Sequence, residues 1–74
     1  MANTIYSKEH SSLVDRLKKA RLEAGLDQAA VAKLLKKSQS YISKIESGQR
    51  RVDVIQLKKF ADIYKRNLNY FLNK

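Results

Sequence analysis

The chain has 74 residues, and its 16 Lys and Arg outnumber its 7 Asp and Glu, which gives a formal net charge of +9. A chain of this length is expected to form one domain over residues 1–74 with a modest core, because it buries only about 60 to 65% of its unfolded surface. The absence of Cys excludes disulfides, thiolate zinc sites and thiol chemistry.

The composition favours an all-α protein, since there is no Pro, there are only two Gly, and good helix formers recur throughout. The first ten residues, MANTIYSKEH, lack the apolar run of a signal peptide. No stretch approaches the roughly 18 apolar residues of a membrane span. We therefore expect a soluble cytoplasmic protein.

A strongly basic domain attracts polyanions, and nucleic acid is the commonest of these. An anionic membrane surface is an alternative partner. The simplest alternative is that the charge only keeps a small protein in solution.

Residues 1–6 are expected to form a flexible arm. A first helix is predicted from a cap at Ser7, or from an alternative cap at Ser12, to Gly25. Steps of three and four residues define its buried stripe, which contains Tyr6, His10, Leu13, Val14, Leu17, Ala20, Arg21 and Ala24.

Residues 27–48, DQAAVAKLLKKSQSYISKIESG, are the centre of the chain and predict two short helices joined by a tight turn. The first begins at Asp27 as N-cap and ends near residue 35. The second begins at Ser38 as N-cap and ends at Gly48, a residue type suited to the left-handed conformation that ends helices. The first helix buries Val31, Ala32 and Leu35 and leaves Leu34 partly exposed.

The second of these helices has a narrow apolar face, formed by Ile42 and Ile45. Its opposite face carries short hydroxyls and one ammonium, with an amide on the flank, and these belong to Gln39, Ser40, Ser43, Lys44 and Ser47. A merely solvated helix would favour long Glu and Lys side chains here. This face is therefore a candidate binding surface.

The loop GQRRVD follows and places Arg50 and Arg51 side by side. A fourth helix is predicted from a cap at Asp53 to about residue 65, with a buried stripe formed by Val54, Leu57, Phe60, Ala61 and Tyr64. Residues 67–69 are expected to interrupt the helix, and a last apolar turn of helix follows at residues 70–72.

The segment LDQAAVAKLLKKSQSYISKIESGQRR resembles the helix-turn-helix of the Cro and phage-repressor (XRE-type) family of bacterial DNA-binding proteins. The residues in register with that family are Gln28, Ala32, Ser38, Gln39, Ser40, Ile42, Ser43, Ile45, Glu46 and Gly48. The resemblance covers about residues 7–72. It implies an all-α, five-helix, phage-repressor-like domain that binds double-stranded DNA as a transcriptional regulator, expected to be a repressor.

The resemblance also implies roles for individual residues. Candidates for reading bases in the major groove are Gln39, Ser40, Ser43 and Lys44. Candidates for contacts with the DNA backbone are Gln28, Ser38, Arg50 and Arg51, and Gln28 is also a candidate to brace Gln39. Arg21 and Glu46 correspond to a structural ion pair of the family. Tyr41 is a weaker candidate for a phosphate or thymine-methyl contact, with packing as its alternative.

Two departures from the family lie in the turn. Lys36 replaces the turn glycine, so a residue with a Cβ is expected at positive φ, at a cost of roughly 1 kcal/mol or more. Lys37 replaces an apolar residue that would pack on Ile42, so only its aliphatic stem is expected to do so.

Other functions have less support. We expect no enzyme, no cofactor and no metal site, because the one histidine, His10, lies on the core stripe and no catalytic motif is present. The alternative within the same fold is a protein-interaction module, such as an antitoxin or a coactivator-type bridge. Non-specific coating of nucleic acid ranks third.

One such domain contacts half a DNA site, so we expect a homodimer on an inverted repeat, acting at the nucleoid. The predicted dimer surface consists of Leu68, Tyr70, Phe71 and Leu72, which resemble the family's dimer-forming end. The alternative is that these residues close the core of the monomer.

Overall fold

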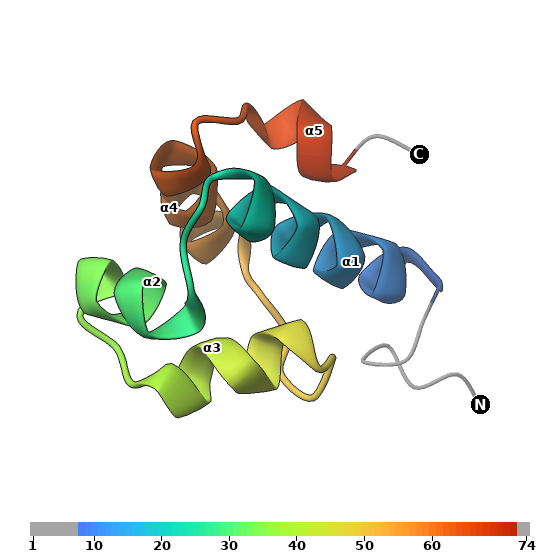
Figure 1. The fold of residues 1–74 in the computed structure, drawn as a ribbon. Coiled ribbons are helices and arrows are strands. Elements are labelled where there is room, and N and C mark those ends of the chain that lie inside the picture. The colour runs from blue at the N-terminus through green and yellow to red at the C-terminus, as the bar shows by residue number, and fades with distance from the viewer. Residues whose placement is uncertain (1–7, 73–74) are drawn as a thin grey trace.

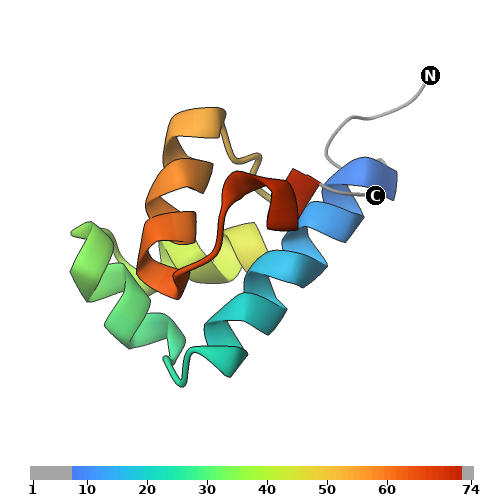
Figure 2. The ribbon, with the colours of Figure 1, turned by 90° about the horizontal axis from the view of Figure 1, so that it is seen from above.

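The computed structural model describes residues 8–72, which form five helices and, over that range, no strand. The helices are α1 (Lys8–Glu23), α2 (Gln28–Leu35), α3 (Gln39–Glu46), α4 (Val54–Tyr64) and α5 (Leu68–Leu72). Figure 1 shows α3 along the lower edge of the molecule and α5 at the upper edge, with α1 between them. Figure 2 shows α5 lying between α4 and α1, which it contacts. The all-α, five-helix prediction is confirmed.

The predicted start at Ser12 is wrong, because α1 already includes residues 8–11. The expected arm, Tyr6 and the cap at Ser7 lie outside the described residues. Within the described part of the chain, no helix has both the length and the apolar character needed to cross a bilayer.

The helix starts follow local hydrogen bonding. At three of the predicted N-caps the side-chain oxygen accepts a hydrogen bond from the backbone N–H three residues later, at 2.8 Å for Asp27, 3.1 Å for Ser38 and 2.8 Å for Asp53. These bonds satisfy amides that have no partner within the helix. Asn67 accepts a bond from the Tyr70 N–H in the same way, at 3.0 Å. Consequently α5 begins two residues before the predicted last turn.

Four helices end in the left-handed region. Gly25 and Gly48 have φ of 75° and 84°, and two lysines, Lys36 and Lys65, both have φ of 58°. Lys36 was predicted to adopt this conformation, whereas Lys65 was not. For both lysines the backbone around the cap forms the usual closing bonds, including Lys37 N–H to the Ala32 carbonyl at 2.8 Å. Each lysine therefore carries the steric strain of a Cβ at positive φ.

Lys36→Gly and Lys65→Gly should each raise the free energy of unfolding by about 1 kcal/mol, because glycine adopts this conformation without a Cβ clash. The pair is matched, since both positions have φ of 58° with ψ of 43° and 45°, and both changes remove one positive charge. Urea unfolding measures the effect. A destabilising result at both positions would show that neither lysine is strained.

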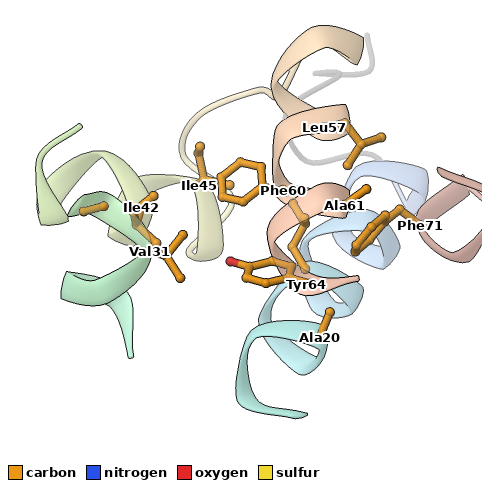
Figure 3. Close-up of a cluster of buried hydrophobic side chains, with 11 residues drawn as sticks. Ala20, Val31, Ile42, Ile45, Leu57, Phe60, Ala61, Tyr64 and Phe71 are labelled. Carbon is orange, nitrogen blue, oxygen red and sulfur yellow. The ribbon is translucent and has the colours of Figure 1, made fainter. Parts of the chain in front are cut away.

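The core is built on α4. The largest side chains below 2% exposure are Phe60, Leu17, Ile42, Ile45 and Val31. Figure 3 shows Val31 of α2 and Ile42 of α3 across from Phe60 and Tyr64 of α4. Since the buried residues of α2 and α3 pack toward α4, the opposite faces of these two helices lie outward. Ala32 is also buried, as expected where two helices approach closely.

Two predicted core positions are wrong. Ala24 is exposed, because it follows the last residue of α1, and Val54 is 62% exposed at the first position of α4. Both lie at a helix end. Leu34 is 59% exposed, as predicted.

The predicted dimer surface also needs correction. Phe71 is 3% exposed and belongs to the core of the monomer, so it cannot be presented to a second copy. Leu68 and Tyr70 are half-buried against the same core. The Tyr70 ring meets Phe71 edge-on, and the Tyr70 carbonyl accepts a 2.8 Å hydrogen bond from Arg16 Nη1 of α1. Only Leu72, at 54%, is well exposed.

Candidate nucleic-acid interface

The outer face of α3 is open to solvent. The four candidate base-reading residues, Gln39, Ser40, Ser43 and Lys44, are all exposed. On the opposite side of the helix, Ile42 and Ile45 are 0% and 1% exposed. Because α3 lies at the edge of the molecule (Figure 1), no other described element covers this face. A partner can therefore approach all four side chains together.

Three of the candidate backbone residues flank α3 in the chain, and the fourth lies on α2. Ser38 is exposed and uses its Oγ as the N-cap acceptor, which leaves its hydroxyl hydrogen for a partner. Arg50 and Arg51 are exposed in the loop between α3 and α4. Gln28, the first residue of α2, is half-buried.

Arg21 of α1 and Glu46 of α3 form the ion pair that the family resemblance implied. Arg21 Nε lies 2.6 Å from Glu46 Oε2, and Nη2 lies 3.0 Å from Oε1. Their side chains are only 8% and 5% exposed. The hydrogen bond to Glu46 raises the pKa of Arg21 above its usual value. A third bond, from Arg21 Nη1 to the Leu26 carbonyl at 2.9 Å, fixes the guanidinium plane.

Gln28 joins this network, which the sequence did not predict. Its Nε2 donates to Glu46 Oε1 at 3.0 Å. One carboxylate on α3 therefore accepts bonds from α1 and from the first residue of α2. The second N–H of this amide can still donate a hydrogen bond to a phosphate oxygen. Glu46 consequently orients a candidate backbone contact as well as closing the ion pair.

Tyr64 lies beside this network with its hydroxyl buried. The oxygen has no hydrogen-bond partner within the described structure, and the residue is only 4% exposed. Figure 3 shows the oxygen directed from α4 toward Val31 on α2. Burial raises the pKa of Tyr64 well above its usual value, and the negative charge of Glu46 adds to this, while Arg21 acts in the opposite direction.

Tyr64→Phe should raise the free energy of unfolding by about 1 kcal/mol at pH 7, because it removes a buried hydroxyl that makes no hydrogen bond. It should also flatten the stability profile at alkaline pH. The folded-state pKa lies above the unfolded value, so titration of this group leaves the stability unchanged below about pH 10 and lowers it progressively as the pH rises further. Urea unfolding from pH 7 to 11 tests both effects, and a destabilised variant would indicate that the hydroxyl is satisfied.

Two cations lie on the ring of Tyr41, in an arrangement that sequence reasoning missed. Lys37 Nζ, in the turn before α3, is 5.3 Å from the ring centroid, and Arg50 Cζ, in the loop after α3, is 4.8 Å from it. Tyr41 itself is half-buried against the core, in keeping with the packing alternative. The available signal was the spacing of Lys37 and Tyr41, four residues apart. No sequence spacing indicated that Arg50 would return to the same ring.

The distribution of possible metal ligands and of histidine is as follows. Among the described residues there is no group of three or more His, Asp or Glu that could hold a metal ion. His10 is 8% exposed and lies within α1. The exposed residues on and beside α3 are polar or basic, so they can form hydrogen bonds and charge pairs.

The two short helices α2 and α3, with an outward second helix and basic flanks, define a helix-turn-helix domain. In agreement with this geometry, the model of a helix-turn-helix family matches residues 17–71. The chain belongs to this XRE-type helix-turn-helix family. The family consists of DNA-binding regulators and is generally non-enzymatic. No curated protein matches the sequence.

Proposed function

We propose that the protein is a sequence-specific double-stranded DNA-binding regulator that inserts α3 into the major groove. The observation that carries the proposal is the division of α3 into a fully buried apolar face and an exposed face of amide, hydroxyl and ammonium groups. A major groove about 12 Å wide admits one α-helix, and short side chains let the backbone approach the bases.

The four exposed side chains suit different bases. Gln39 has the geometry for a bidentate pair with adenine, and Lys44 for donation to guanine O6 and N7. Ser40 and Ser43 are short and both donate and accept, so they fit either type of base edge. In this proposal Gln39 and Lys44 provide most of the discrimination between sequences.

Contacts with phosphates hold the domain in register without reading sequence. Ser38, Arg50 and Arg51, which flank α3 in the chain, and Gln28, which is bonded to Glu46 of α3, serve this purpose in the proposal. The net charge of +9 supports it, because neutralised phosphates release counterions. A small domain bound in this way blocks other proteins from the same DNA, and for this reason we infer a repressor acting at the nucleoid in the cytoplasm.

We further propose that two copies bind an inverted repeat. The exposed end of α5, at Leu72, supports a contact at the flank of the molecule, with half-buried Leu68 and Tyr70 at its border. A two-fold axis that runs vertically in Figure 1, beside this end of α5, would leave α3 of both copies at the lower edge, on the same side of the dimer. A DNA duplex requires this arrangement. Sedimentation at tens of micromolar, with and without DNA, tests the dimer. A monomer under both conditions would contradict it.

The experiment for the function is selection of bound sequences from a random duplex pool at 0.15 M salt. We expect enrichment of an inverted repeat with half-sites one helical turn apart, about 34 Å. Enrichment of a single half-site would support the function and reject the dimer. A pool that shows no enrichment would reject sequence-specific binding. If a site is enriched, a transcription assay with that site separates repression from activation.

A further inference from the structure

The cluster of Lys37, Tyr41 and Arg50, here called the Tyr41 cluster, connects the two ends of α3. Lys37 precedes the N-cap Ser38, and Arg50 lies in the loop beyond the helix. Both cations are exposed, while the ring that both contact is half-buried and packed against the core. The ring is therefore a fixed support for two side chains that would otherwise be mobile.

The physical effect of such a support is to order the cations before a ligand arrives. Lys and Arg side chains each have about 2 kcal/mol of rotamer entropy in solution. Contact with an aromatic face is favourable by about 0.5 to 1 kcal/mol at an exposed site, which is enough to bias each rotamer. The two positive charges that contact one ring also repel each other, and phosphates bound near them reduce that repulsion.

We propose that Tyr41 is a positioning residue for the DNA backbone, and that Lys37 and Arg50 form with it a two-cation site for phosphate groups beside α3. Lys37 is thereby a further phosphate-binding residue. The inference rests on the proposed function, because the phosphates are those of a duplex bound by α3. The ring acts through the two cations, and the phenolic hydroxyl is not needed.

The first test uses the free protein. In the NMR spectrum, the side-chain methylene protons of Lys37 and Arg50 should show upfield ring-current shifts. These shifts should persist in Tyr41→Phe and disappear in Tyr41→Leu, which keeps an apolar side chain but removes the aromatic face. Random-coil shifts in the wild-type protein would overturn the proposal without any DNA experiment.

The second test measures binding to a random-sequence duplex over a range of salt concentrations. Lys37→Ala and Arg50→Ala should each reduce the slope of log K against log salt by about one unit. Tyr41→Leu should weaken binding by about 2- to 10-fold for each side chain that must now be ordered on binding. Tyr41→Phe should bind like the wild type. Equal losses in the Phe and Leu variants would overturn the role of the ring in favour of the hydroxyl.

Double variants separate positioning from general destabilisation. Arg50→Ala should cost less in the Tyr41→Leu background than in the wild type, because the ordering advantage is already lost. Arg51→Ala is the matched control, since Arg51 is adjacent but outside the Tyr41 cluster, and its cost should be equal in both backgrounds. Additive effects for Arg50 would overturn the proposal. If the wild type binds duplex DNA and only these comparisons fail, this inference fails alone, whereas a wild type that binds no duplex rejects the proposed function as well.

Discussion

Glu46→Ala is expected to lower the free energy of unfolding by about 3 to 5 kcal/mol, because it leaves the buried Arg21 guanidinium without its counter-charge. It also removes the acceptor of the Gln28 amide. A domain of this length has a total stability on the order of 4 to 11 kcal/mol. The variant should therefore unfold at much lower urea concentrations, as followed by circular dichroism.

Glu23→Ala is the matched control for this loss. Glu23 pairs with Arg66 at 2.8 Å, but the two side chains are 43% and 38% exposed, so breaking this bridge should cost less than about 1 kcal/mol. A double replacement, Arg21→Met with Glu46→Leu, should recover much of the stability lost in Glu46→Ala, because no charge then remains buried. Similar losses for Glu23→Ala and Glu46→Ala would show that burial of the pair is not what makes it important.

The double variant Gln39→Ala, Lys44→Ala should weaken binding to the selected DNA site by about 2 to 6 kcal/mol, since each bidentate contact contributes about 1 to 3 kcal/mol of discrimination and separated contacts are roughly additive. Its affinity for random duplex should change much less. Both side chains are exposed, so unfolding by urea should be nearly unchanged. Competition binding with selected and random duplexes measures the specificity ratio.

Two single replacements show whether this loss arises from base reading. Lys18→Ala removes the same charge from an exposed position on α1 and should leave the specificity ratio unchanged. Arg51→Ala should weaken binding to selected and random duplexes alike. If the double variant lowers both affinities equally, as Arg51→Ala is expected to do, then Gln39 and Lys44 are not base readers.

Local features of this fold could be predicted from sequence. The caps at Asp27, Ser38 and Asp53 are correct because a cap depends on bonds between residues three apart. The positive φ at Lys36 followed from a family position that is normally glycine. The outward α3 face followed from helical periodicity. The Arg21–Glu46 pair came from the family resemblance, since 25 residues separate its members.

The features that were missed depend on how helices pack. Periodicity placed Val54 in the core, but its position at the end of α4 leaves it exposed. The apolar character of Phe71 fitted a dimer surface and a monomer core equally well, and only the packing of α5 against α1 and α4 decides between them. The bond from Gln28 to Glu46 and the approach of Arg50 to Tyr41 depend on side-chain rotamers, which periodicity does not specify.

The shared carboxylate of Glu46 has a consequence for how this protein could acquire a new target. It joins the first three helices through hydrogen bonds from Arg21 and Gln28, and the exposed side chains at positions 39, 40, 43 and 44 take no part in those bonds. Substitutions at these four positions should therefore alter the preferred operator while the scaffold stays intact. A library randomised at these codons should yield mostly folded variants, from which new specificities can be selected.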